Sequence, residues 1–148
     1  MKMQRLPLIV LIVLFICISF GYNLMKEKKS LSTLKIGFLL STMQEERYYK
    51  DKEYFTEKCR ELGAEVIFDS ADNDEREQVA KAENMLTRGI SALVVQPVNS
   101  DTASRIVDLC HKDEVPVIAY DRIINNCNLD LYVTQDSFRV GVLQAEAA

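Results

Sequence analysis

The chain has 148 residues, of which 48% are hydrophobic and 27% charged, a composition typical of a folded domain rather than of a disordered chain. The formal net charge is −4, and the basic residues are spread along the chain, which argues against a nucleic-acid partner. The single histidine, His111, has no cysteine or histidine at ligand spacing. We therefore expect it to be a plain surface residue, and we expect neither a metal site, nor a cofactor, nor a catalytic triad.

The first 25 residues differ in character from the rest. Lys2 and Arg5 precede an almost unbroken apolar run over residues 6–20. Small residues at Ser19 and Gly21 suit the cleavage site of a signal peptide. The stretch up to Met25 is also long enough, at about 20 residues, for an uncleaved membrane anchor. Both interpretations predict a segment that contacts the membrane. They place the remainder outside the cytoplasm, in the periplasm or at the outer face of the cytoplasmic membrane.

Residues 26–33 read as a short polar linker, after which strands and helices alternate. Compact apolar runs predict strands, and apolar residues at helical spacing predict helices. In chain order we expect a strand at 34–40, a helix at 48–62, a strand at 65–68, a helix at 75–88, a strand at 91–95, a helix around 103–110, strands at 116–120 and 131–133, and a helix from 138 onward.

The helices carry recognisable faces and ends. In the first helix the residues expected on the buried face are Tyr48, Phe55, Cys59 and Leu62, and in the second they are Val79, Ala82 and Leu86. Gly63 and Gly89 stand where a helix end prefers glycine. Polar clusters at 72–74 and 99–101 provide the side chains that begin a helix.

The strands are unbroken apolar runs, which indicates a sheet covered on both faces. Strands joined by helices must be parallel, with right-handed crossovers. The predicted fold class is therefore α/β, an open doubly wound parallel sheet with helices on both faces. Ligands bind such sheets beyond the carboxyl ends of the strands.

Side chains that hydrogen-bond well follow all five strands, at residues 41–48, 69–73, 96–99, 121–122 and 134–136. Asp72, Asn73 and Asn99 have an alternative role as turn or helix-start residues. Asp121 and Arg122 do not precede a helix pattern, so ligand contact is the favoured interpretation for this pair.

No glycine-rich phosphate loop follows any strand, which argues against a nucleotide. Carboxylates and amides mixed with arginines suit a neutral polyhydroxyl ligand, because each hydroxyl both donates and accepts a hydrogen bond. The Tyr48 ring is placed to support the apolar face of a sugar. We predict that the sugar contacts are Arg47, Asp121, Arg122, Tyr48, Glu46, Asn73 and Gln96.

Several stretches resemble the type I periplasmic sugar-binding proteins, and within that family the D-xylose-binding members of ABC transporters. They are residues 35–38, 46–51, 71–73, 83–89 and 119–124, the last reading AYDRII, with Tyr132 and Asp136 later. The resemblance implies two lobes that close on a sugar about a hinge. It also implies that Arg47 and the Asp121–Arg122 pair contact sugar hydroxyls, whereas Tyr48 stands where the family has a larger aromatic.

The resemblance implies that residues 34–136 form the N-terminal lobe, with a hinge near 134–136, and that residues 137–148 begin a second lobe. The last predicted helix runs to the end of the sequence without a cap, so we expect a fragment or truncated product. One lobe supplies about half of the contacts of a cleft, so little or no sugar affinity is expected from this chain alone.

Three functions compete. The first is a substrate-binding protein that delivers D-xylose or a related monosaccharide to an ABC permease. The second is a membrane-anchored sensor that presents the sugar to a histidine kinase. The third, a sugar-responsive repressor, would need a DNA-reading helix pair where this chain has an apolar segment. An enzyme is not expected, since no nucleophile–base pair is visible.

Overall fold

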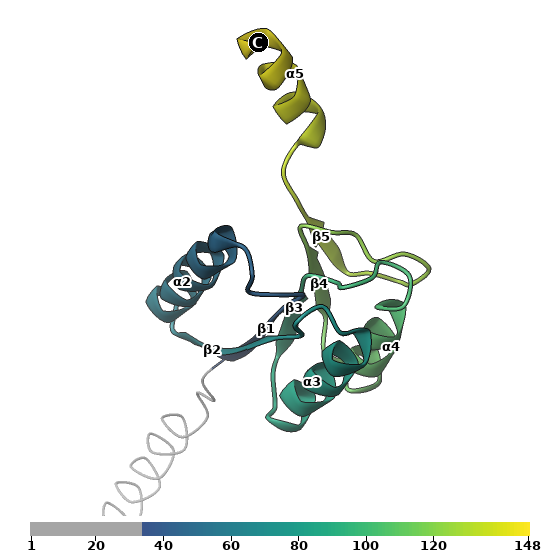
Figure 1. Ribbon diagram of the computed structural model, residues 1–148. Coiled ribbons are helices and arrows are strands. Elements are labelled where there is room, and N and C mark those ends of the chain that lie inside the picture. Colours follow the sequence, from purple (N-terminus) through teal and green to yellow (C-terminus); the bar gives the residue numbers. More distant parts are fainter. Residues whose placement is uncertain (1–33) are drawn as a thin grey trace, which may run out of the picture. The chain divides into compact units, whose positions relative to one another are not determined.

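The computed structural model describes residues 34–148 (Figure 1). The predicted signal peptide or anchor (residues 1–25) and the predicted linker (residues 26–33) lie outside the described residues. Within residues 34–148, the helices are too short or too polar to cross a membrane.

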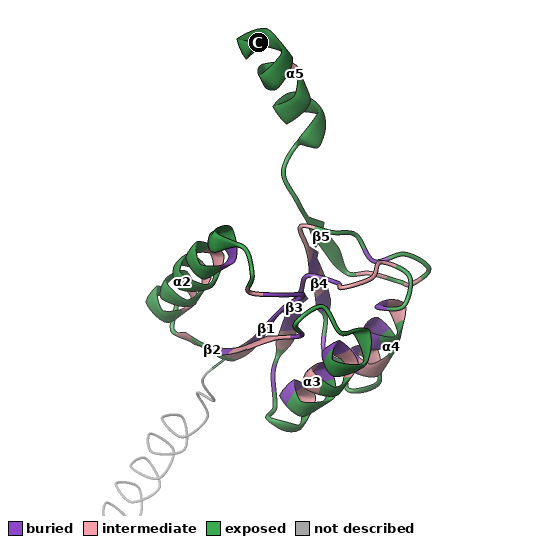
Figure 2. Ribbon diagram, in the orientation of Figure 1, coloured by how far each residue is buried: buried purple, intermediate pink, exposed green. Residues whose placement is uncertain are grey.

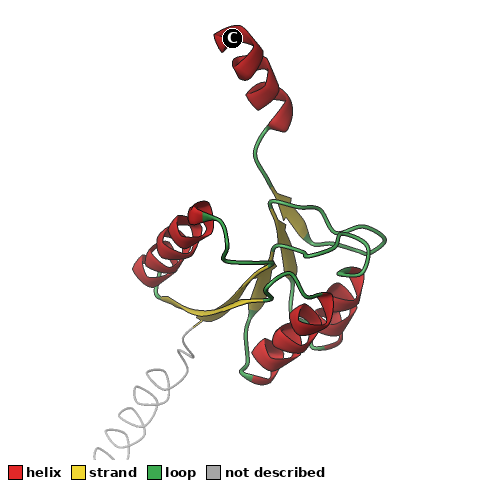
Figure 3. Ribbon diagram, viewed as in Figure 1, coloured by secondary structure: helices red, strands yellow, loops and turns green. Residues whose placement is uncertain are grey.

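The order of strands and helices is the predicted one, including a connection between the fourth and fifth strands that contains no helix (Figure 3). The elements are β1 (Leu34–Leu40), α2 (Glu46–Glu61), β2 (Ala64–Ser70), α3 (Glu75–Thr87), β3 (Ala92–Val95), α4 (Ser104–Lys112), β4 (Val117–Tyr120), β5 (Leu131–Val133) and α5 (Ser137–Ala147).

The five strands form one sheet in the order β2-β1-β3-β4-β5, and every neighbouring pair is parallel. The chain moves outward from β1 to β2 and then crosses back to β3 on the other side of β1. This reversal is the switch point of a doubly wound sheet, and it leaves the carboxyl ends of β1 and β3 side by side. The predicted α/β fold class is confirmed.

Each face of the sheet has its own hydrophobic core, because successive side chains of a strand point to opposite faces. Leu39 of β1 packs into the cluster formed with α3 and α4, whereas Phe38 and Leu40 pack on the α2 side. On that side the rings of Phe38 and Phe55 lie 4.4 Å apart between centroids. Figure 2 shows buried residues in the central strands and on parts of α3 and α4.

The helix ends follow the predicted chemistry. Gly63 (φ 80°) and Gly89 (φ 74°) have the left-handed backbone that ends α2 and α3. The Asp74 carboxylate caps α3 by accepting hydrogen bonds from the backbone N–H groups of Arg76, at 2.7 Å, and Glu77, at 3.0 Å.

One predicted helix face needs correction, and another is broader than predicted. Leu62 is 76% exposed, so its expected place on the buried face of α2 is wrong. The helix ends at Glu61, and Leu62 is the cap residue, already outside the helical repeat. In α3 the predicted residues Val79, Ala82 and Leu86 all pack against the core, and Gln78 and Met85 are buried beside them.

The last two elements contribute little to the core. All three residues of β5 are exposed, and α5 has no buried residue (Figure 2). Apolar side chains of α5 are open to solvent, Phe138 at 83% and Leu143 at 48%. The assignment of residues 137–148 to a second lobe stays a prediction.

Replacing Leu93, which is completely buried in β3, by alanine is expected to lower the free energy of unfolding by about 2–5 kcal/mol, because a cavity forms in the core. The same replacement at the exposed Leu62 is the matched control and should change it by less than about 0.5 kcal/mol. Urea denaturation of both variants measures the difference. Equal losses would contradict the described packing of α2.

Candidate functional site

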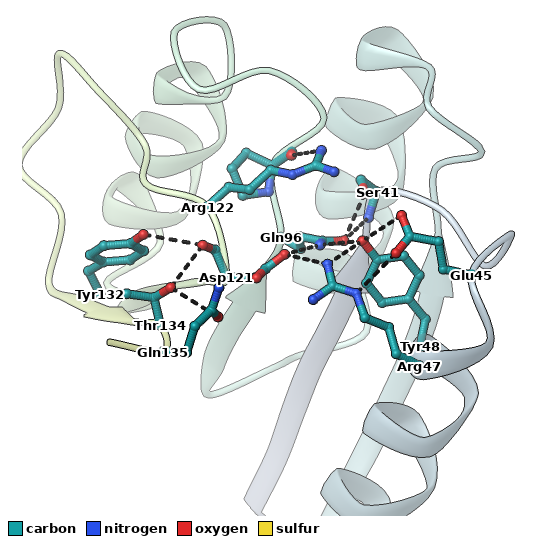
Figure 4. Close-up of polar contacts among 11 residues, drawn as sticks. Ser41, Glu45, Arg47, Tyr48, Gln96, Asp121, Arg122, Tyr132, Thr134 and Gln135 are labelled. Atoms are coloured by element: carbon teal, nitrogen blue, oxygen red, sulfur yellow. Dashed lines mark hydrogen bonds and ion pairs between the residues drawn. The ribbon is translucent and has the colours of Figure 1, made fainter. Parts of the chain in front are cut away.

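Polar side chains from separate strands meet at the carboxyl edge of the sheet (Figure 4). Ser41, Gln96, Asp121 and Thr134 are the first residues after β1, β3, β4 and β5. Their convergence follows from the parallel sheet, since all its strands end at the same edge. The polar residues that were predicted to follow these strands therefore lie along one edge, which is called the rim below.

Gln96 lies at the centre of the rim and is completely buried. Its Oε1 accepts hydrogen bonds from Ser41 Oγ at 2.7 Å and from Ser41 N at 3.3 Å. Its Nε2 donates to Tyr48 Oη at 2.9 Å and to Asp121 Oδ2 at 2.8 Å. All four hydrogen-bonding positions of the amide are used, so its orientation is determined by its neighbours.

Tyr48 is also completely buried, and its ring belongs to the hydrophobic cluster with Phe38 and Leu40. Its hydroxyl accepts hydrogen bonds from Arg47 Nη2 at 2.8 Å and from Gln96 Nε2. The prediction that the Tyr48 ring supports a sugar is wrong for this structure, because the ring has no exposed face. What Tyr48 offers at the rim is a hydroxyl that orients two neighbours.

Arg47 and Asp121 form the ion pair of the rim, with Nη2 and Oδ2 2.8 Å apart. Arg47 Nε also pairs with Glu45 Oε2 at 3.1 Å, and the guanidinium lies over the Tyr48 ring at 4.6 Å from its centroid. The Arg47 side chain is 48% exposed and that of Asp121 is 10% exposed. The pair thus sits at the boundary between the buried amide of Gln96 and solvent.

The protonation of this pair follows from its surroundings. The hydrogen bond that Arg47 donates to Asp121 raises the pKa of Arg47 further above its ordinary value. Burial works against ionisation of Asp121, but the hydrogen bonds from Arg47 and Gln96 outweigh it, and the pKa of Asp121 lies below its ordinary value. Both groups are therefore charged at neutral pH.

Two polar atoms of the Arg47–Asp121 pair have no hydrogen-bond partner within residues 34–148. Among the contacts within residues 34–148, neither Asp121 Oδ1 nor Arg47 Nη1 has a hydrogen-bond partner. One is an acceptor and the other a donor, and they belong to side chains held 2.8 Å apart by their other atoms. A hydroxyl group can donate to the first and accept from the second.

The structure brings Arg47, Tyr48, Gln96 and Asp121 together, and the other predicted contacts do not bond to this group. Glu46 pairs with Lys50 at 3.3 Å, and its side chain is 88% exposed. A sugar-contact role stays a prediction, both for the residues that the structure brings together and for those outside that group.

Asn73 and Arg122 also lie outside the Arg47–Asp121 network. Asn73 is an exposed turn residue with a φ of 64°, and its backbone N–H donates to Ser41 O at 2.7 Å. This agrees with the alternative turn role. Arg122 is exposed and donates to the Pro97 carbonyl at 3.4 Å (Figure 4).

Gln78 supports the rim from below, and sequence reasoning did not select it. Its Nε2 donates to Gln96 O at 2.8 Å, and its Oε1 accepts from Val98 N at 2.9 Å. It is 2% exposed, so both ends of its amide need these partners. An amide on the apolar face of α3 was the signal in the sequence that could have revealed it.

His111 is not the plain surface residue that was predicted. Its Nε2 lies 2.8 Å from Asp130 Oδ2, and the same oxygen accepts a hydrogen bond from Val117 N at 2.8 Å. These hydrogen bonds lower the pKa of Asp130, that of Val117 most. The contact ties the end of α4 to the start of β5.

An apolar groove of about 470 Å³ lies on the α2 side of the sheet, lined by Phe38, Asp51, Tyr54, Phe55, Val94, Ile118, Tyr120, Leu131 and Val133. Burial, with Asp51 nearby, raises the pKa of Tyr120 to about 12, so its hydroxyl stays neutral. Asp51 is the charged residue of a lining that is otherwise mostly apolar and aromatic. The groove therefore offers a polyhydroxyl ligand fewer hydrogen bonds than the rim does.

Comparison with known proteins identifies the family. The model of the periplasmic binding protein domain matches residues 36–148, most of the chain. The chain belongs to this family. A family of binding proteins agrees with the expectation that the chain is not an enzyme.

Individual members of the periplasmic binding protein family show how much of a whole protein is present. The chain is 40% identical to the D-xylose-binding periplasmic protein of Haemophilus influenzae over 77% of its own length and 34% of that protein. It is 39% identical to the D-xylose-binding periplasmic protein of Escherichia coli strain K12, with the same coverage of each chain. The chain thus spans about a third of the length of these relatives.

A solved structure gives the same result for the fold. An ABC transporter solute-binding protein from Clostridium phytofermentans with bound β-D-glucose superposes with a TM-score of 0.72 at 31% identity. The match covers 76% of this chain and 35% of that one.

Replacing Asp121 by asparagine is expected to destabilise the lobe by about 1–2 kcal/mol at neutral pH. The estimate is low for a charged pair because Arg47 is half exposed. Because the native pKa of Asp121 is lowered, the wild type loses this stabilisation as the pH falls from about 4 through the native pKa, whereas D121N does not.

Urea denaturation of wild type and D121N between neutral and strongly acidic pH measures this difference. Asp108→Asn, on the exposed side of α4, is the matched control and should follow the wild type. A stability gap between wild type and D121N that stays constant across the acidic range would contradict the assigned pair.

Proposed function

We propose that the rim around Arg47 and Asp121 binds a neutral monosaccharide, D-xylose or a close relative, in an exported protein that delivers it to an ABC permease. The observation that carries the proposal is the ion pair with a spare acceptor, Asp121 Oδ1, beside a spare donor, Arg47 Nη1, within residues 34–148. A sugar hydroxyl satisfies both at once.

The charges at the centre of the rim favour an uncharged ligand. The Arg47 guanidinium and the Asp121 carboxylate are 2.8 Å apart and neutralise each other. An anionic ligand such as a phosphorylated sugar would meet the Asp121 carboxylate. Hydrogen bonds to charged groups contribute about 1.5–3 kcal/mol each, so a few of them hold a small polyol.

The choice of D-xylose rests on the two D-xylose-binding relatives at 40% and 39% identity. Export is supported by the apolar segment in the first 25 residues and by the periplasmic names of these relatives. Delivery to an ABC permease is favoured by the similarity to the ABC transporter solute-binding protein from Clostridium phytofermentans. A membrane histidine kinase as the partner, and retention of the N-terminal segment as an anchor, stay alternative predictions.

In a protein that contains this lobe and a second one, Asp121→Ala is expected to weaken D-xylose binding tenfold to a hundredfold, which corresponds to roughly 1.5–3 kcal/mol. The loss arises because the substitution removes both the acceptor and the partner that orients Arg47. Calorimetric titration with D-xylose gives the dissociation constant. Asp108→Ala serves as the control, and an unchanged constant for D121A would remove Asp121 from the site.

The lobe of residues 34–148 alone is expected to bind D-xylose with little or no affinity, since it provides one wall of the proposed cleft. Calorimetry on this lobe with D-xylose tests the expectation. A dissociation constant in the micromolar range would show that one wall is sufficient.

A further inference from the structure

Strand β5 makes an unusual contribution to the lobe. It has three residues, all of them exposed, so it adds no buried side chain to either core. Nevertheless it pairs with β4 in regular parallel register, from Ile118–Leu131 to Tyr120–Val133. Since β5 does little for the core, its other contacts indicate what it does for the protein.

Those contacts converge on the backbone of Asp121. The N–H of Asp121 donates to Val133 O at 2.9 Å. The carbonyl of Asp121 accepts from Tyr132 Oη at 3.2 Å and from Thr134 Oγ1 at 3.1 Å (Figure 4). Both backbone groups of one residue are thus held by β5 and by the first residue after it.

The conformation of Asp121 explains why it needs to be held. Its φ is 66°, in the left-handed region that side-chain-bearing residues rarely adopt. Such a residue persists only where its surroundings determine it strongly. The three hydrogen bonds between Asp121 and residues 132–134 are those surroundings.

The unusual φ also decides where the carboxylate points. Rotation about φ carries the Cα–Cβ bond with it, so relaxation to a negative φ would move Oδ2 away from Arg47 Nη2 and Gln96 Nε2. Both contacts are 2.8 Å long, and hydrogen bonds weaken as the atoms move apart or out of line.

We propose that Tyr132 and Thr134 are positioning residues for the Asp121 carboxylate, acting through its backbone carbonyl. The inference rests on the proposed sugar site, because it assigns these residues a role in shaping that site. Thr134 also begins the connection of residues 134–136 from β5 to α5. A change in the position of Thr134 therefore acts on Asp121 through the hydrogen bond to its backbone carbonyl.

The opposite end of β5 is tied independently. Asp130 accepts hydrogen bonds from Val117 N and contacts His111, both at 2.8 Å. Loss of one hydroxyl at residue 132 or 134 therefore leaves the strand paired with β4 and anchored at its start. Removing either hydroxyl is thus expected to change the orientation of the Asp121 carboxylate without unfolding the lobe.

The test replaces each hydroxyl in the full chain by a group of similar shape, Thr134→Val and Tyr132→Phe. The side-chain carboxyl of Asp121 is titrated by NMR in each variant. In the wild type its pKa should lie below the ordinary value, and in both variants it should rise toward about 3.9, because the carboxylate loses its aim at Arg47. Thr134→Ser keeps the hydroxyl and should restore the wild-type pKa.

Matched controls remove the same groups elsewhere. Thr102→Val deletes an exposed hydroxyl that donates to Glu75, and Tyr49→Phe deletes one on the exposed side of α2. Neither should alter the titration of Asp121. A merely structural role of the hydroxyls would lower the melting temperature of T134V and Y132F while leaving the pKa of Asp121 in the folded protein unchanged, and that result would overturn the proposal.

A second measurement separates this inference from the proposed function. In a protein with both lobes, T134V should weaken D-xylose binding roughly two- to tenfold, the effect of one neutral hydrogen bond, and Thr134→Ser should recover it. If wild type with both lobes fails to bind any sugar while the pKa of Asp121 still responds to T134V, the proposed function fails and the positioning role stands. Unchanged titration in T134V and Y132F overturns the positioning role whatever the sugar result.

Discussion

The buried amide of Gln96 connects the parts of this rim. It accepts from Ser41 after β1, donates to Tyr48 of α2 and to Asp121 after β4, and its own backbone carbonyl is held by Gln78 of α3. A buried amide with an unmet donor or acceptor is costly, so all these partners must be present together. The arrangement of the rim is therefore a consequence of satisfying one side chain at the switch point of the sheet.

Around this amide the polarity of the site changes stepwise from core to solvent. Gln96 and Tyr48 are completely buried, Asp121 is nearly so, and Arg47 is half exposed. The charged pair is thus held from below by groups that cannot move freely, which prepares it for a ligand without further ordering. In the proposed site, the rigidity comes from the sheet and the chemistry from the two charged side chains at its edge.

The edge strand β5 shows that an element with little share in the core can still matter to a site. Its hydrogen bonds hold Asp121 in a left-handed conformation, and its start is tied to α4 by Asp130 and His111. For a second lobe that begins with α5, as the family resemblance implies, the connection from this lobe would start at Thr134. The movement of the lobes and the orientation of the Asp121 carboxylate would then both depend on this connection.

The sequence alone was sufficient for the fold class, the order of the elements and the rim, because apolar periodicity and turn chemistry are local properties of the chain. It also placed Arg47 and Asp121 at the same edge. Tertiary structure decided which rim residues meet: it buried the Tyr48 ring, left Leu62 outside its helix and recruited Gln78, Tyr132 and Thr134. These outcomes depend on strand register, on where a helix stops and on one positive φ, which arise from contacts between residues far apart in the chain.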